Sequence, residues 1–128
     1  MNEASLTLVS GLFGGLGAAL RVSAILLLTD RAGVPMRFTV LVVNLTGSAV
    51  AGACTAAFDR LEGHDLARAA VIGGILGGFT TFSSFAIECI EQWQRGFRAR
   101  AVRYAGVSIT GCATAAWAGF EVLRRVWP

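Results

Sequence analysis

Three long stretches without a charged side chain constrain this chain more than any other feature of its sequence. They are Phe38 to Phe58, Ala69 to Ile87 and Tyr104 to Phe120, and a fourth, Ser5 to Thr29, is interrupted only by Arg21. A helix that crosses a lipid bilayer needs about 20 mainly apolar residues. Charged residues make up 15% of the chain, against about 25% in a soluble domain. We therefore predict an all-α integral membrane protein with four spanning helices.

The charged residues gather in short connections between these stretches. The connections are Asp30 to Arg37, Asp59 to Arg68 and Glu91 to Arg103. Because almost nothing is left for a soluble domain, we expect residues 1–128 to form a single transmembrane unit. The start, MNEASLTLVSG, is acidic where a secretory signal is basic, so we interpret it as the beginning of the first span.

The arginines divide almost evenly between the two sides of the membrane. With four spans, the side that holds both termini and the second connection carries four arginines, and the other side carries six. The arginine bias that orients a membrane protein is therefore weak. Two interpretations stay open: insertion in both orientations, or one orientation fixed by the cluster from Arg95 to Arg103. With dual insertion, two copies could pair as an antiparallel homodimer. Such a dimer would have the inverted symmetry that transport folds often use.

Glycines are concentrated in the first and third spans. A GxxxG pair lets two membrane helices approach closely, and packing is its favoured interpretation. The first span holds the pair Gly11 and Gly15, extended by Gly14 and Gly17, and the third holds two overlapping pairs formed by Gly73, Gly74, Gly77 and Gly78.

The third span also carries polar residues where a plain apolar helix would be expected. It reads GGILGGFTTFSSFAIE from Gly73 to Glu88. Each glycine costs about 1 kcal/mol in a helix relative to alanine, so four glycines before Thr80 and Thr81 predict a helix broken near its middle. A break frees carbonyls that suit a small cation and N–H groups that suit an anion. After it, the ring edges of Phe82 and Phe85 carry partial positive charge and could contact an anion, although packing is the commoner role.

Polar residues also lie inside the other spans. Arg21 either reaches the membrane surface with its long side chain or faces a water-filled cavity, where it attracts anions. Asn44 either binds a neighbouring helix or donates a hydrogen bond to an anion. Tyr104, Ser108 and Cys112 step by four residues and therefore line one face of the fourth span.

Together these stretches resemble the Fluc (CrcB) family of fluoride channels over nearly the whole chain. The motifs that carry the resemblance are GAALR, LVVNLTGS and the long, aromatic GGFTTFSSF. The resemblance implies a passive, fluoride-selective channel that exports fluoride from the cytoplasm across the inner membrane of a bacterium. It also implies an antiparallel homodimer of dual-topology subunits with two pores and one buried structural sodium ion.

The resemblance also implies roles for individual residues. Phe82 and Phe85 match pore-lining phenylalanines, and Asn44 matches a fluoride hydrogen-bond donor. Gly77 and Thr80 match the break, where backbone carbonyls of both subunits hold the sodium ion. The remaining pore positions are Arg21 near the pore mouth, Ser83, Ser84 and Glu88 after the break, and Tyr104 and Ser108 on a polar track along the fourth span. The next position of this track is often serine in the family. Here it is Cys112, whose thiol is a weaker hydrogen-bond donor than a hydroxyl.

Two other functions stay open. A small multidrug-resistance-like transporter would share the architecture, but it predicts a carboxylate in the middle of the first span, where the nearest acid is Glu3. A membrane scaffold subunit would explain the glycines but not Asn44, Arg21 or the TTFSS run. An enzyme is not expected, since the spans lack catalytic His or paired carboxylates. Nucleic acid is not an expected partner, because the arginines belong next to lipid headgroups.

Overall fold

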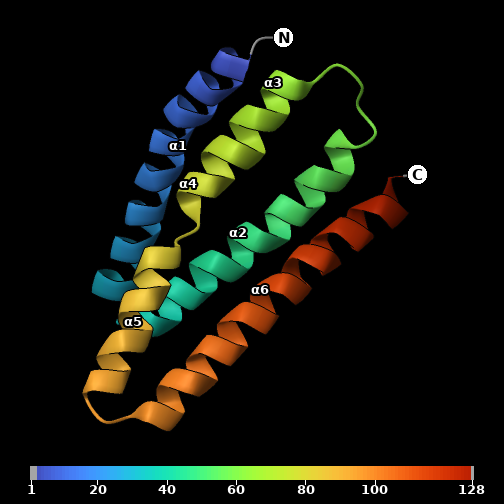
Figure 1. The fold of residues 1–128 in the computed structure, drawn as a ribbon. Coiled ribbons are helices and arrows are strands. Elements are labelled where there is room, and N and C mark those ends of the chain that lie inside the picture. Colours follow the sequence, from blue (N-terminus) through green and yellow to red (C-terminus); the bar gives the residue numbers. More distant parts are fainter. Residues whose placement is uncertain (1–2, 128) are drawn as a thin grey trace.

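A computed structural model describes residues 3–127 as a chain of helices, without a strand in that range (Figure 1). This arrangement confirms the predicted all-α class. The elements are α1 (Glu3–Leu26), which ends in the π-helical turn η1 (Leu27–Arg31), then α2 (Met36–Phe58), α3 (Asp65–Arg68), the π-helical segment η2 (Ala69–Leu76), α4 (Gly77–Phe79), α5 (Phe82–Gln94) and α6 (Arg98–Val126).

Three helical stretches among the described residues are long and apolar enough to cross a membrane. They are Glu3–Arg31, Met36–Phe58 and Asp65–Gln94, and they contain the first three predicted spans. The fourth predicted span lies within α6, which has 29 residues. Its length suffices, but its glycines, hydroxyl residues and arginines make it less apolar than the other three, so the fourth crossing stays a prediction.

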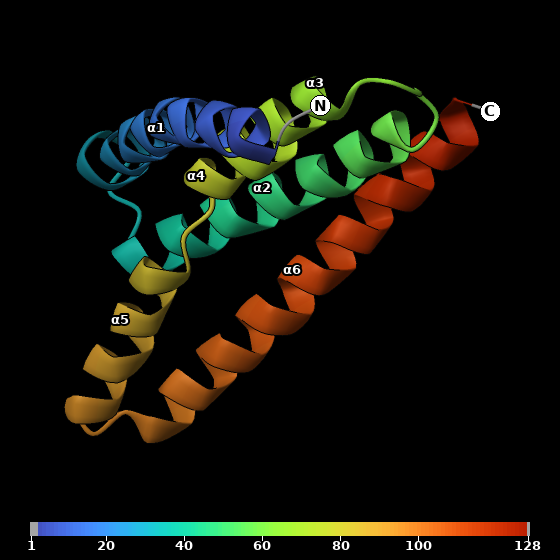
Figure 2. The same cartoon turned by 45° about the horizontal axis from the view of Figure 1, so that its top comes forward.

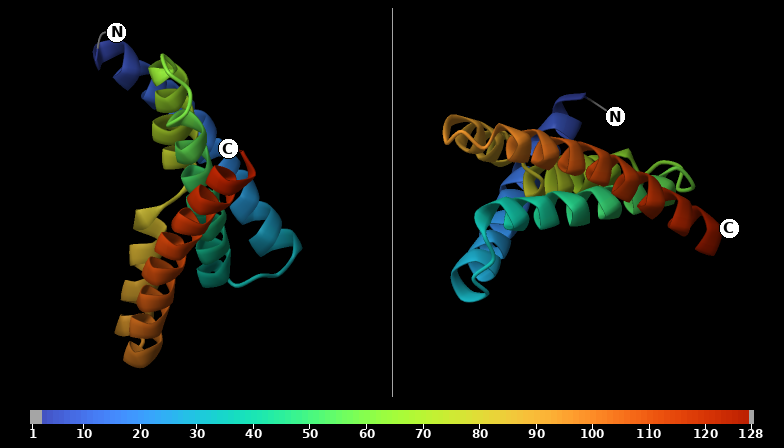
Figure 3. Two further views of the ribbon diagram at one scale, coloured as in Figure 1. Left: turned by 90° about the vertical axis from the view of Figure 1, so that its right-hand side faces the viewer. Right: turned by 90° about the horizontal axis from the view of Figure 1, so that it is seen from below.

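The connections are shorter than predicted because the helices continue into the charged segments. Only residues 95–97 separate α5 from α6. Gly96 adopts a φ of 84°, which glycine tolerates best. The N–H of Gly96 donates to the carbonyl of Trp93 at 3.0 Å, and the N–H of Phe97 donates to that of Gln92 at 2.9 Å. This Schellman motif ends α5. The short turn that follows reverses the chain, so that α6 runs antiparallel beside α5 (Figure 3).

The helices pack in two groups. In one group α1 lies along η2 and α4, and in the other α2 lies along α6 (Figure 1 and Figure 2). The groups meet where α2 also contacts α1, η2 and α4. Successive spans alternate in direction, so both termini and residues 59–64 lie at one end, which we call the terminal end. Residues 32–35 and 95–97 lie at the other, which we call the turn end.

Glycine allows both groups to pack closely, but not at every predicted position. A Cβ atom added to Gly17 would collide with the backbone of Ile75, and one added to Gly78 would collide with the backbone of α1. By contrast, a Cβ atom at Gly11 or Gly15 would meet nothing within 4 Å. The packing face of α1 within this chain is therefore offset from the predicted GxxxG pair.

The contact between α2 and α6 also depends on glycine. A Cβ atom at Gly52 would collide with the backbone of Ala116, and one at Gly119 would collide with the backbone of Ala49. The two helices therefore touch backbone to backbone at the terminal end. Toward the turn end both helices also contact α5, the second half of the interrupted third span.

Candidate functional site

The third span is interrupted at two threonines, as the sequence predicts. The helical hydrogen bonds end where the N–H of Thr80 donates to the carbonyl of Leu76 at 3.0 Å. Thr80 (φ −76°, ψ 158°) and Thr81 (φ −145°, ψ 115°) are extended, which appears in Figure 2 as the thin connection between α4 and α5. The glycines before the break are all helical, so the break begins later than their positions suggest.

Thr81 restarts the helix as the N-cap of α5. Its Oγ1 accepts a hydrogen bond from the N–H of Ser84 at 3.2 Å and donates to the Oγ of Ser84 at 3.0 Å. A threonine in this position satisfies an N–H group that has no partner within the helix. Ser84 is therefore committed to the cap, while Ser83 is exposed and lies 3.3 Å from the same Thr81 hydroxyl.

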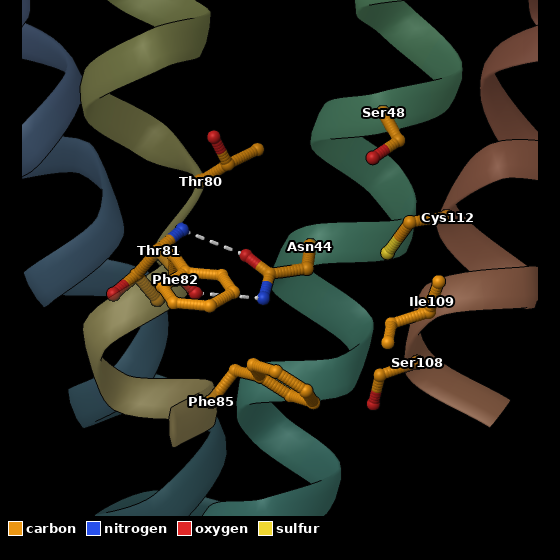
Figure 4. Close-up of a pocket in the computed structure, with 9 residues that line it drawn as sticks. All are labelled: Asn44, Ser48, Thr80, Thr81, Phe82, Phe85, Ser108, Ile109 and Cys112. Atoms are coloured by element: carbon orange, nitrogen blue, oxygen red, sulfur yellow. Dashed lines mark hydrogen bonds between the residues drawn. The ribbon is translucent and has the colours of Figure 1, made fainter. Parts of the chain in front are cut away.

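Asn44 of α2 binds the backbone of the break with both ends of its amide. Its Oδ1 accepts from the N–H of Thr81 at 2.8 Å, and its Nδ2 donates to the carbonyl of Thr81 at 2.9 Å (Figure 4). Thr81 is buried, so these two backbone groups would otherwise lack partners. Of the two alternatives for Asn44, the interhelical role is therefore present. One N–H of Nδ2 remains for a further acceptor.

Residues from three spans meet around one pocket beside the break. We call this hollow of about 250 Å³ the break pocket (Figure 4). It is lined by Asn44, Ser48, Thr80, Thr81, Phe82, Phe85, Ser108, Ile109 and Cys112. The lining contains amide, hydroxyl and thiol groups, aromatic rings and an aliphatic side chain, but none of its side chains is charged. Such a lining suits a small ion that needs weak substitutes for its hydration shell.

Three aromatic rings form a row beside the break pocket. The ring centroids of Phe82 and Phe85 are 5.6 Å apart with an interplanar angle of 51°, and those of Phe85 and Tyr104 are 5.8 Å apart. The tilted geometry turns ring edges, which carry partial positive charge, toward neighbouring groups. Phe82 is 79% exposed within its own chain, so this side of the break pocket is left uncovered.

Two hydroxyl groups on α6 are buried without a partner. Tyr104 is 8% exposed and Ser108 is 5% exposed, and in the described chain neither hydroxyl has a hydrogen-bond partner. Buried polar groups nearly always have one. Ser108 lines the break pocket, as does Cys112 one turn further on. The predicted polar face of this helix is therefore turned inward.

Six predicted residues do not line the break pocket. Ser83 and Ser84 contact the hydroxyl of Thr81, and Tyr104 lies beside Phe85. The other three are Arg21, Gly77 and Glu88. The carboxylate of Glu88 lines neither this pocket nor the neighbouring one that contains Tyr104. Arg21 also lines neither of them, and its Nε is buried without a partner among the described residues. Gly77 lies on α4, where an added Cβ atom would touch only its own helix, and faces no other span of this chain.

Sequence reasoning missed three contributors to the site. The role of Thr81 as cap and as the partner of Asn44 was not predicted, although a Thr three residues before Ser84 is the pattern of an N-cap. Ile109 also lines the break pocket, and its type carries no sequence signal for a site. A third residue, Gly47, leaves room on α2 for the side chain of Thr80, which an added Cβ atom there would contact.

Comparisons with known proteins agree with this picture of a membrane protein. Residues 8–120 match the family model described as CrcB-like protein, Camphor Resistance (CrcB). A protein of Novosphingobium aromaticivorans named fluoride-specific ion channel FluC is 36% identical over 115 residues, which cover 88% of this chain and 91% of that protein. A protein of the same name in Mesorhizobium japonicum is 32% identical over 113 residues, which cover 88% of this chain and 91% of that protein. Another, in Rhizobium meliloti, is 31% identical over 120 residues, which cover 93% of this chain and 96% of that protein.

Proposed function

The chain belongs to the CrcB family, and from this premise we propose that it is a passive, fluoride-selective channel of a bacterial membrane. The family consists of ion channels, so the chain is not an enzyme. Its three apolar helical stretches and its bacterial relatives make it a multi-pass bacterial membrane protein. We place it in the inner membrane, where it exports fluoride: hydrogen fluoride enters as a neutral molecule, dissociates inside, and the anion leaves through the pore.

One observation carries this proposal. The break pocket brings Asn44, Phe82, Phe85 and the unpartnered hydroxyl of Ser108 around a single uncharged space. A strongly hydrated anion crosses a membrane only if its water is replaced by contacts loose enough for it to leave. The free N–H of Asn44, two ring edges and a hydroxyl are contacts of that kind.

The path that we infer continues along α6. From the break pocket a fluoride ion would pass from Ser108 to Tyr104, whose hydroxyls are both buried and unpartnered. Tyr104 lies beside Phe85 and lines the neighbouring pocket at the turn end. In the opposite direction along α6, the next side chain is Cys112, which also lines the break pocket. Its thiol is a weaker hydrogen-bond donor than a hydroxyl. We assign Arg21, Ser83 and Glu88 to the wider approaches of the pore.

We propose that the working unit is an antiparallel homodimer of four-span subunits with two pores. The break pocket is open beside Phe82, whose ring is 79% exposed within its own chain. A second copy in the opposite orientation would cover this ring and complete the wall of the pocket. Each of the two equivalent pockets would then become a pore.

The break also fits the proposed structural sodium ion. Because the N–H of Thr81 donates to Asn44, the carbonyl of Gly77 loses its usual donor four residues later. Carbonyl oxygens are suitable ligands for a small, hard cation, and those of Gly77 and Thr80 would hold it together with their counterparts in the second copy. The bound ion would supply a fixed positive charge that offsets part of the cost of an anion in a medium of low dielectric constant.

The test of the proposed function is ion efflux from liposomes that contain the purified protein, read with a fluoride electrode and, separately, a chloride electrode. We expect rapid fluoride release and negligible chloride release. Absence of fluoride release from a well-folded dimer would overturn the proposal. Equal release of both anions would overturn the selectivity.

A further inference from the structure

A second pocket, at the turn end, collects arginines. It has a volume of about 470 Å³, and we call it the arginine basin. It is lined by Arg37, Phe38 and Leu41 of α2, Gln92 of α5, and Arg100, Arg103, Tyr104 and Val107 of α6. Three arginines thus line one space that no carboxylate lines.

The arginines of the two ends differ in how they are paired. At the terminal end, Arg60 donates to the carbonyl of Arg124, Arg68 pairs with Asp59, and Arg124 and Arg125 pair with Glu121. At the turn end only Arg95 has an ion pair within residues 3–127, with Glu91 at 3.1 Å. The three basin arginines have none, although the charge of Arg37 reaches the Glu88 carboxylate without an ion pair between the two. Three arginines that line one pocket without an ion pair favour an anion from outside the chain.

Two buried polar atoms of the basin also lack partners. Tyr104 and Gln92 are 8% and 7% exposed, and in the described chain neither the Tyr104 hydroxyl nor the Gln92 Oε1 has a hydrogen-bond partner. The hydroxyl can donate to an anion, and the amide oxygen can accept from a hydroxyl group. The basin therefore presents a donor and an acceptor beside its positive charge, which suits an anion that carries hydroxyl groups.

Both helices that supply the arginines begin at the basin. α2 starts at Met36 and α6 starts at Arg98, and neither N-cap residue, Pro35 or Phe97, provides a side-chain cap. The N-terminus of a helix carries a partial positive charge. Two such ends add to the field of the arginines.

Aromatic residues place the basin at the depth of lipid headgroups. The guanidinium of Arg37 lies 4.6 Å from the ring centroid of Phe38, and that of Arg100 lies 4.5 Å from the ring centroid of Phe97. Both rings are about half exposed. Arginines gather in the connections next to membrane spans, and Trp and Tyr, here Trp93 and Tyr104, gather at the boundary between membrane and water. A phosphate group that reaches the basin would therefore most readily come from a lipid.

We propose that the arginine basin binds the phosphate of an anionic glycerophospholipid headgroup. Arg37, Arg100 and Arg103 hold the phosphate oxygens, which guanidinium groups suit by geometry. The Gln92 amide oxygen accepts from a headgroup hydroxyl, while the Tyr104 hydroxyl stays available to the fluoride path. Free inorganic phosphate has the same chemistry but lacks the lipid tail, which the apolar side chains beside the basin would contact.

The test uses the purified full chain in a neutral detergent. Its thermal unfolding midpoint is measured with added phosphatidylglycerol, phosphatidylcholine or inorganic phosphate. We expect phosphatidylglycerol alone to raise the midpoint at micromolar concentrations. The double variant R100Q/R103Q should need at least tenfold more of this lipid for the same shift. R95Q/R98Q is the matched control, since it removes the same charge at the same end from residues that do not line the basin.

Three outcomes would overturn the proposal. Equal weakening by both double variants would mean general attraction to the basic end. An equal shift from inorganic phosphate would assign the basin to the free ion. No shift with the parent chain, together with no phosphatidylglycerol retained in native mass spectrometry, would remove the site. If R100Q/R103Q does not fold, R100Q and R103Q are measured singly. None of these readouts depends on fluoride conduction, so this test and the efflux test fail independently.

Discussion

At the scale of single residues, Asn44 has two tasks that different substitutions separate. It pairs with both backbone groups of Thr81 and keeps one N–H for the break pocket. Asn44→Ala leaves two buried groups unpaired, each at a cost of about 1–3 kcal/mol. We expect a clear fall in the thermal unfolding midpoint of the purified protein. Thr46→Ala on the same helix should change it little, because that hydroxyl is exposed and binds only its own helix. Equal midpoints for the two variants would contradict the role of Asn44 at the break.

Asn44→Asp tests the second task. The carboxylate still accepts from the N–H of Thr81, but it cannot donate and it repels an anion in the break pocket. We expect fluoride efflux from liposomes to stop even for protein that elutes as the normal folded species. Unchanged efflux would remove Asn44 from the fluoride path while leaving its structural role intact.

The phenylalanines of the break pocket provide a separate test. Ile keeps the bulk of Phe82 or Phe85 but has no ring edge. If each edge supplies about 1 kcal/mol, as aromatic contacts do, either substitution slows fluoride flux about fivefold. The same change at Phe120, which does not line the break pocket, is the control. Normal flux from Phe82→Ile and Phe85→Ile, with all three variants folded, would refute the proposed role of the rings.

At the scale of helical elements, two glycines on α1 should respond in opposite ways to the same substitution. Gly17→Ala drives a methyl group into the backbone of Ile75, and such overpacking costs about 1–3 kcal/mol. Gly15→Ala meets nothing within 4 Å and should gain up to about 1 kcal/mol of helix propensity. Thermal unfolding of the two variants measures the difference. A large loss for Gly15→Ala would mean that another copy packs there, and no loss for Gly17→Ala would contradict the packing of α1 on η2.

The existence of the helix break could be predicted from sequence, but its cause could not. The glycine-rich run and the threonine pair indicate a weak point, and the structure has one. Gly74 and Gly78 nevertheless stay helical and serve the packing against α1. The break itself depends on the Thr81 cap and on Asn44, which is 37 residues away. A contact between distant residues leaves no local pattern, just as GxxxG spacing does not say which helix face meets a partner.

At the scale of the whole molecule, the pattern of apolar stretches predicted the course of the chain. Charge-free runs locate the spans, and short connections require that neighbouring spans alternate in direction (Figure 1). The break pocket and the arginine basin needed the structure, because each combines α2, α5 and α6. The same structure leaves Phe82 uncovered, so the proposed antiparallel dimer depends on the orientation in which a second copy inserts.

The orientation of the chain in the membrane can be tested by changing its arginine balance, which is six arginines at the turn end against four at the terminal end. A cysteine introduced by Glu62→Cys, in the exposed connection at the terminal end, is labelled in intact cells with a membrane-impermeant maleimide. Near-balanced charge predicts that about half the chains react, since bias in arginine sets orientation. Arg124→Gln with Arg125→Gln changes the balance to six against two and should move the labelled fraction toward one. The exposed ion pairs that this removes contribute little to stability.

The same variant links orientation to function. If chains inserted in one orientation cannot form antiparallel dimers, the shift in labelling should be accompanied by loss of fluoride efflux from cells. The variant protein, purified and reconstituted into liposomes where both orientations form, should conduct as the parent does, because neither Arg124 nor Arg125 lines the break pocket. Labelling of the parent chain from one side only, with normal fluoride efflux, would rule out the antiparallel dimer as the working unit.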